Sequence, residues 1–220
     1  MTIYRPIKST KKTQGFGENQ ACLSLATRKV KSKVNGVCPP GFRDLYLIQG
    51  LLGHTGEDWS TWYKEPCHFP AVIEGMTWTA YTENDKDGGL GVDVYSDKPV
   101  ELDGRETNIK LRFWHLAEQK VYDGQPVVPG QLIGLCDSTG ASSGNHLHWS
   151  LKRTDASLVT LDSENGYRGA IDFKPWFKNV FIQDIKETPP DLITQQKIVD
   201  VIRQIIFAIQ SALKGQNITR

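Results

Sequence analysis

The sequence lacks a long apolar run. None of its segments approaches the roughly 20 consecutive apolar residues that a membrane-spanning helix needs. Residues 1–20 are polar and contain no apolar stretch of the kind that a secretory signal peptide carries. We therefore expect no transmembrane span. If the chain works outside the cell, we expect another export route, or a chain whose numbering begins after processing.

The sequence also lacks a strong net charge. It holds 26 basic and 25 acidic side chains, so no overall field indicates specific binding to nucleic acid. The charge is uneven, because residues 1–45 carry nine basic and only two acidic side chains. A basic arm could lie against an anionic cell-wall polymer or a nucleic acid, but we favour the alternative of a solvated basic face.

Cysteine is scarce. The four that occur, Cys22, Cys38, Cys67 and Cys136, form no Cys-x-x-Cys pair. A zinc site built from cysteines is therefore not expected. The even count permits disulfides, and Cys22 with Cys38 would close a modest loop. Free, buried cysteines are the alternative.

Short apolar runs separated by Gly, Pro, Asp and Asn extend from about Leu45 to Leu161. Within 90–95 and 147–151, apolar residues alternate with other types, which predicts strands with one buried and one open face. We expect an irregular basic segment over residues 1–45, packed on a mainly β domain over 46–180.

The pattern of apolar residues changes after residue 188. Apolar residues recur at spacings of three, four and seven from Leu192 to Leu213, and Gly215 ends the stripe. This pattern predicts an amphipathic helix over 189–215. We expect it to pack on its own domain or to serve as an oligomerisation or docking element, rather than to enter a membrane.

Histidine is rare as well, with five in the chain, and the first motif is Gly-His-Thr-Gly-Glu-Asp at 53–58. His54 and Asp58 are four residues apart, which puts both side chains on one face of a helix or of a strand. A neutral imidazole and a carboxylate are good zinc ligands. On a strand Glu57 would point away from a metal, so we expect it to be solvated or to support the site from behind.

The second motif is His146-Leu147-His148, which follows a glycine-rich turn at 138–144. Only an extended strand puts both imidazoles on one face, with Leu147 and Trp149 anchored in the core on the other. The pattern favours a metal site over a pair of exposed strand histidines.

The third motif is Phe-Trp-His-Leu at 113–116. On a regular strand His115 would share a face with Leu111 and Phe113. A lone histidine on an apolar face is more often a satisfied core residue than a catalyst.

Together the three motifs resemble the lysostaphin-like zinc metallopeptidases. They occur in that family's order, and the connecting run from Val121 to Gly134 also matches its pattern of valines and glycines. The resemblance covers roughly Gln14 to Arg153. It implies an antiparallel β-sheet or barrel-like sandwich of the duplicated hybrid motif type.

The resemblance further implies that His54, Asp58 and His148 bind one zinc ion, and that His115 and His146 are the two catalytic histidines. Three protein ligands leave the fourth tetrahedral position for water, as in catalytic zinc sites. One histidine could take the proton of that water and the other could hydrogen-bond the developing oxyanion, in an order that the sequence leaves open. Some relatives have a tyrosine before the first motif that helps hold the oxyanion. Tyr46 is the nearest here, at an unusual spacing.

The resemblance therefore predicts a zinc-dependent endopeptidase that cuts peptide bonds of bacterial peptidoglycan, in the cross-bridge or in the stem peptide. It would act outside the cell or in the periplasm, as a lysis or cell-wall remodelling factor, and a phage-encoded chain would fit the missing signal peptide. The alternative is a non-catalytic module of the same fold that binds the cell wall or activates another hydrolase. Such a module is expected to lack some of the ligands.

Overall fold

The computed structural model describes residues 1–27 and 29–185. The helix expected over 189–215 lies outside the described residues. As predicted, the described chain is mainly β, and its helical content consists of three short 3-10 turns, η1 Leu47–Gln49, η2 Lys174–Trp176 and η3 Ile182–Asp184. Among the described residues no helix is long and apolar enough to cross a membrane.

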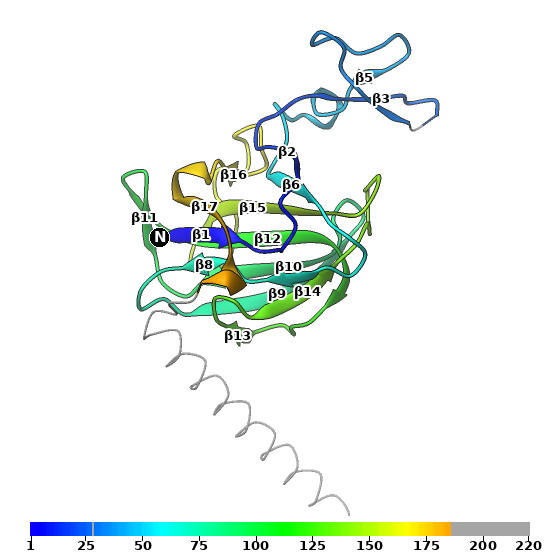
Figure 1. The fold of residues 1–220 in the computed structure, drawn as a ribbon. Helices are drawn as coiled ribbons and strands as arrows, with labels where there is room; N and C mark the ends of the chain where they lie inside the picture. The colour runs from blue at the N-terminus through cyan, green and yellow to red at the C-terminus, as the bar shows by residue number, and fades with distance from the viewer. Residues whose placement is uncertain (28, 186–220) are drawn as a thin grey trace, which may run out of the picture.

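An eleven-stranded antiparallel sheet carries most of the chain (Figure 1). Its main path runs β13-β9-β10-β12-β15-β6-β2, and four further strands pair onto it from the side. The bounds are β2 Lys12–Gln14, β6 Glu57–Ser60, β7 Pro66–His68, β9 Trp78–Asp85, β10 Gly89–Ser96, β11 Val100–Leu102, β12 Arg105–Gln119, β13 Gln125–Val127, β14 Leu132–Cys136, β15 His146–Thr154 and β16 Ala170–Ile171.

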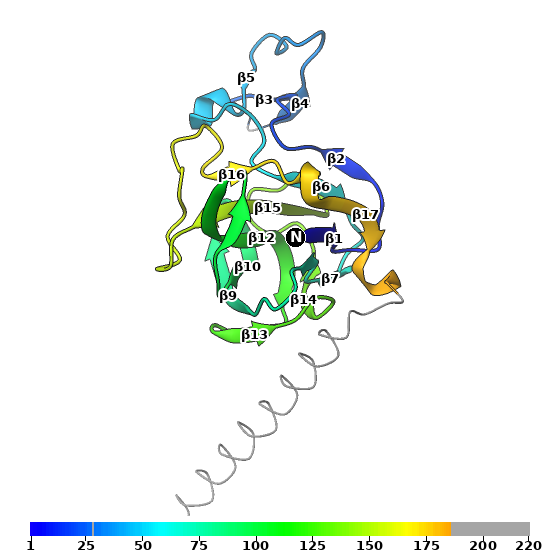
Figure 2. The ribbon, with the colours of Figure 1, turned by 90° about the vertical axis from the view of Figure 1, so that its left-hand side faces the viewer.

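A second sheet, in the order β17-β1-β8, lies inside the curve of the first (Figure 2). Its strands are β1 Thr2–Arg5, β8 Ala71–Val72 and β17 Phe177–Phe181, and β1 pairs with β17 in parallel. The large sheet curls around β1 without closing into a barrel.

The hydrophobic core fills the inner face of the curled sheet. Alternate residues of β12 and β15, such as Leu111, Phe113, Trp149 and Leu151, are at most 1% exposed and belong to one cluster. The period-two pattern over 147–151 therefore predicts β15 correctly, because the apolar set of the strand needs a buried side.

The pattern suggested that the opposite face of these strands is open, but that face is buried as well. Asp93 and Lys110 are each at most 5% exposed. Asp93 accepts hydrogen bonds from Lys110 (2.9 Å) and from Arg112 (2.7 Å). The expectation of a solvated second face is wrong here, because a network of paired charges lets polar side chains be buried.

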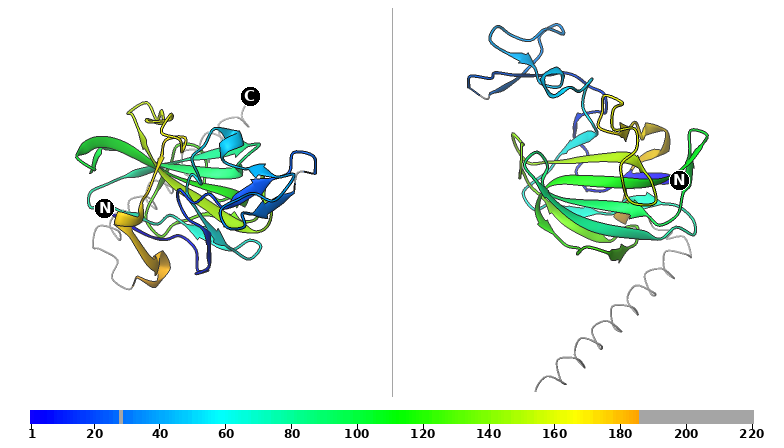
Figure 3. Two further views of the ribbon diagram at one scale, coloured as in Figure 1. Left: turned by 90° about the horizontal axis from the view of Figure 1, so that it is seen from above. Right: turned by 180° about the vertical axis from the view of Figure 1, so that it is seen from behind.

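The N-terminal segment is more ordered than its glycines and prolines suggested. It contributes β1 and β2 to the two sheets and forms a third sheet of its own, with strands β3 Ala21–Leu23, β4 Val30–Ser32 and β5 Arg43–Asp44. This small sheet projects beyond the main one (Figures 1 and 3). A disulfide joins Cys22 and Cys38 across it, whereas Cys67 and Cys136 are buried free thiols.

Candidate metal centre

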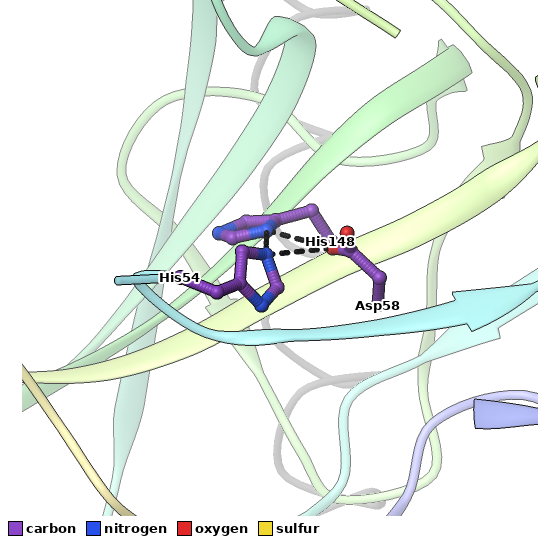
Figure 4. Close-up of side chains that lie close together, drawn as sticks. All are labelled: His54, Asp58 and His148. Carbon is purple, nitrogen blue, oxygen red and sulfur yellow. Dashed lines mark hydrogen bonds and ion pairs between the residues drawn. The ribbon is translucent and has the colours of Figure 1, made fainter. Parts of the chain in front are cut away.

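The structure brings the three predicted ligands together (Figure 4). His54 lies in the loop before β6, Asp58 lies on β6 and His148 lies on β15, directly opposite Asp58 in the register. His54 Nε2 is 3.0 Å from His148 Nδ1 and 3.1 Å from Asp58 Oδ1. His148 Nδ1 is 2.9 Å from the same carboxylate oxygen. Three potential ligand atoms therefore form a nearly equilateral triangle.

The triangle has the size that a zinc ion requires. Bonds of about 2.0 Å at tetrahedral angles place two ligand atoms about 3.3 Å apart. The observed separations of 2.9–3.1 Å are only slightly shorter. Two imidazoles and one carboxylate also match the ligand types that zinc prefers.

Hydrogen bonding alone does not account for these contacts. His54 Nδ1 is 3.2 Å from the carbonyl oxygen of Gly15, so Nδ1 carries the proton and, in the neutral ring, Nε2 presents a lone pair. That lone pair faces the carboxylate of Asp58. Two acceptors at 3.1 Å repel each other unless a cation lies between them. The geometry therefore fits a metal centre in which the carbonyl oxygen of Gly15 orients the His54 ring through Nδ1.

Close backbone packing fixes the loop that carries His54. The His54 amide donates to Glu18 O, and the His54 carbonyl accepts from the Gly17 amide, each at 2.9 Å. A Cβ at Gly53 would lie 2.4 Å from the oxygen of Gly17. Glycine at position 53 is thus required for the approach of the N-terminal segment, which positions His54.

Electrostatics keep His148 and Asp58 in their metal-binding protonation states. Burial lowers the pKa of His148 to about 4, so its ring is neutral at pH 7. Burial alone would raise the pKa of Asp58, but its close contacts with His148 and His54 outweigh burial and leave that pKa well below its usual range. A neutral imidazole and an ionised carboxylate are the forms that bind zinc.

His115 reaches the site through a β-bulge. Leu90 pairs with Leu116 and Val92 pairs with Phe113, so Trp114 and His115 together oppose a single residue of β10. His115 has φ +64°, a conformation that costs a non-glycine residue about 1 kcal/mol. The bulge turns His115 away from the apolar face on which a regular strand would place it.

The two remaining histidines of the site lie side by side. The rings of His115 and His146 are 4.5 Å apart. His115 Nδ1 donates to Thr139 O (2.7 Å) and His146 Nδ1 donates to Gly144 O (2.8 Å). His146 Nε2 is 3.8 Å from Asp58 Oδ2. Burial, and next the charge of His146, lower the pKa of His115, which favours a neutral ring with its Nε2 lone pair free.

Some neighbours of the site were not apparent from the sequence. The ring of Trp114 lies 5.4 Å from that of His148, and Arg112 stacks on Trp114 at 4.8 Å. Tyr46, whose spacing looked unusual, is buried 6.2 Å from the ring of His54. Only the alternation of β12, which places Arg112 and Trp114 opposite the apolar set, gave a signal for these contacts.

The side chains of Glu57 and His68 lie apart from the three ligands. Glu57 points away from them, as expected, but it is buried rather than solvated, with hydrogen bonds from Lys12 (3.3 Å) and Trp59 (2.9 Å). His68 lies on β7, where its Nδ1 is 2.9 Å from Gly130 O.

Comparison with known proteins identifies a family for most of the large sheet. Residues 53–160 match the model of peptidase family M23, and no curated protein is detectably similar in sequence. Solved structures with similarity include a protein described as a peptidase M23 from Pseudomonas aeruginosa (18% identity, TM-score 0.42, covering 78% of this chain and 52% of that one). Another is a zinc-containing peptidase from Vibrio cholerae (19% identity, TM-score 0.46, covering 74% of this chain and 40% of that one).

A third similar structure is the catalytic domain of lysostaphin from Staphylococcus simulans (21% identity, TM-score 0.42, covering 71% of this chain and 90% of that one). The chain spans about half of the length of the first two structures. The family match contains all five motif residues, from His54 to His148. Residues 53–160 are therefore a domain of peptidase family M23, the lysostaphin-like family that the three motifs resemble.

Proposed function

We propose that this chain is a zinc metalloendopeptidase that hydrolyses peptide bonds of bacterial peptidoglycan, in the cross-bridge or in the stem peptide. The observation that carries the proposal is the convergence of His54 Nε2, Asp58 Oδ1 and His148 Nδ1 within 2.9–3.1 Å of one another. Three ligands on one side leave room for water, as a hydrolytic zinc site requires.

The role proposed for zinc is to lower the pKa of a bound water and to polarise the scissile carbonyl. His54, Asp58 and His148 would hold the ion. His115 and His146 would handle protons, because each donates through Nδ1 to a backbone carbonyl and keeps Nε2 free. One of them accepts the proton of the attacking water. The same residue then returns that proton to the leaving amine, while the other, protonated at Nε2, hydrogen-bonds the developing oxyanion.

The proposed substrate and place of action follow from family membership. Peptidoglycan peptides are the proposed partner, with action outside the cell or in the periplasm. We propose no specific nucleic-acid partner, and the docking or oligomerisation role of the segment over 189–215 stays a prediction.

Digestion of defined muropeptides tests the proposal most informatively. Zinc-loaded protein should release fragments that mass spectrometry assigns to one type of peptide bond. A variant with His54→Ala should release none, and His68→Ala should behave as the wild type, because His68 lies apart from the ligands. Failure of the zinc-loaded protein to cleave any of the muropeptides would contradict the proposal.

A further inference from the structure

A polar cavity of about 200 Å³ opens beside the metal centre. His148 forms one part of its wall, and Ser150 and Lys152 form the next. These three residues alternate along β15 and therefore share the face opposite the core. The cavity thus continues the metal centre along the direction of the strand.

The acidic groups in and next to this cavity are already engaged. Asp93 accepts from Arg112 and Lys110, and Asp87 lies 3.5 Å from Arg168. Asp85 accepts from two backbone amides, at 2.8 and 2.6 Å. Asp93 and Asp87 are thus paired with cations, whereas Asp85 is exposed and accepts from backbone amides.

Lys152 is the buried lysine of this cavity, whereas Lys86, which also lines it, is exposed. Lys152 is only 6% exposed, and within the described residues it forms no ion pair. Its ammonium donates one hydrogen bond, to the carbonyl oxygen of Arg168 (2.9 Å), which leaves two of its three donors free. Burial lowers the pKa of Lys152 to about 7. A buried ammonium is costly unless an anion accompanies it.

Ser150 supplies a second unused group in the same wall. The residue is 1% exposed, and its Oγ has no hydrogen-bond partner in the part of the chain that the structure describes. Buried hydroxyls are rarely left unpaired, so a hydroxyl without a partner in the wall of a cavity indicates that a ligand binds there. Ser150 and Lys152 together offer an O–H and an ammonium, which are donors suited to an anion.

We propose that this cavity is a substrate subsite for a carboxylate, held by the Lys152 ammonium and the Ser150 hydroxyl. The inference rests on the proposed peptidase function and refines its substrate. Lys152 lies four positions after His148 on β15, a distance of about 13 Å along an extended strand. The carboxylate therefore lies within about four residues of the scissile bond. Such a site favours an acidic stem peptide over a neutral cross-bridge.

Paired substrates test the subsite. Synthetic peptides that contain the cleaved bond are made with either a carboxylate or a carboxamide at each position within four residues of it. Charged hydrogen bonds predict that kcat/KM favours the carboxylate by about tenfold or more at one position. Lys152→Met should abolish this preference and Ser150→Ala should weaken it. Lys98→Met, which changes an exposed lysine elsewhere, should keep it.

A binding measurement separates this inference from the peptidase proposal. Zinc-loaded full-length protein is titrated with N-acetylglycine and with neutral N-acetylglycinamide while backbone amide NMR signals are followed. Saturable shifts along Ser150 and Lys152 are expected with the carboxylate alone, and they should vanish in Lys152→Met. This readout does not depend on turnover, so it decides the inference even if no peptide is cleaved.

The inference is overturned if carboxylate and carboxamide peptides are cleaved equally at every position. Peptidase activity would then stand without the subsite. It is also overturned if the preference, or the NMR shifts at Ser150 and Lys152, persist in Lys152→Met, since the carboxylate would then bind elsewhere, for instance at the zinc.

Discussion

The protonation of single side chains decides what the metal centre can do. His115 and His146 are both oriented by backbone carbonyls, which fixes their tautomer and leaves Nε2 available. Neither belongs to the triangle of His54, Asp58 and His148. The proposed function therefore gives metal binding and proton transfer to different residues, which mutation can separate.

His115→Ala should keep zinc and lose turnover. Loss of a proton-transfer group typically lowers kcat by about 100-fold or more. The zinc content should equal that of the wild type, because the triangle of ligands is untouched. Steady-state kinetics and metal analysis on the same preparation check both parts. A fully active His115→Ala variant would refute the assignment.

Lys152→Met should stabilise the protein at neutral and acidic pH. Burial, together with Arg112 and Lys110, lowers the pKa of Lys152 from 10.5 to about 7, against the opposing effect of Asp93. Between these two values the unfolded state holds more protons than the folded state, so the wild type gains stability as pH rises. The advantage of the variant should be about 2 kcal/mol at pH 6 and should shrink toward pH 10.

Urea unfolding of the wild type and Lys152→Met from pH 6 to pH 10 measures this difference. Lys98→Met serves as the control, because an exposed lysine should show no such trend. A variant that is less stable than the wild type at pH 6 would show that Lys152 is paired in solution.

At the level of elements, the sequence predicts regular strands better than their irregularities. The alternation in β10 and β15 identifies both strands and the face that carries His146 and His148. The bulge of β12 could not be predicted, because φ +64° at His115 is a local departure enforced by tertiary packing. The pairing of Cys22 with Cys38 was likewise left open, since loop length alone does not choose between a disulfide and free thiols.

Gly91→Ala tests the bulge. A Cβ at this position would lie 2.6 Å from Trp114 Cδ1 and 2.9 Å from the oxygen of Phe113. The substitution should displace Trp114 and cost about 1–3 kcal/mol of stability. Thermal unfolding measures the cost. Gly144→Ala, where nothing lies within 4 Å of the added methyl, should be nearly neutral. Equal stability of the two variants would contradict the packing described for Trp114.

Replacing Cys22 and Cys38 by serine should loosen the small sheet of β3, β4 and β5. The disulfide closes a loop with a sequence separation of 16, and a loop of this size is worth about 3 kcal/mol. Amide hydrogen exchange should accelerate over residues 21–44 and stay unchanged in β10 and β12, which lie in another sheet. Uniform acceleration across the molecule would show instead that the small sheet does not unfold by itself.

At the level of the whole molecule, the fold joins ligands that are far apart in the chain. Asp58 and His148 are 90 residues apart and meet because β6 pairs with β15. The loop before β6 contributes His54. Backbone hydrogen bonds to the N-terminal segment hold this loop in place. The order and spacing of the motifs predicted this set of residues, whereas their distances follow only from the strand register.

Metal analysis of the wild type beside three single variants, His54→Ala, Asp58→Ala and His148→Ala, tests the central claim most directly. Each protein is dialysed with limiting zinc and its bound metal is measured by mass spectrometry. The wild type should hold about one zinc per chain, and each variant should lose most of it. A wild type that binds no zinc, or variants that all retain it, would contradict the account.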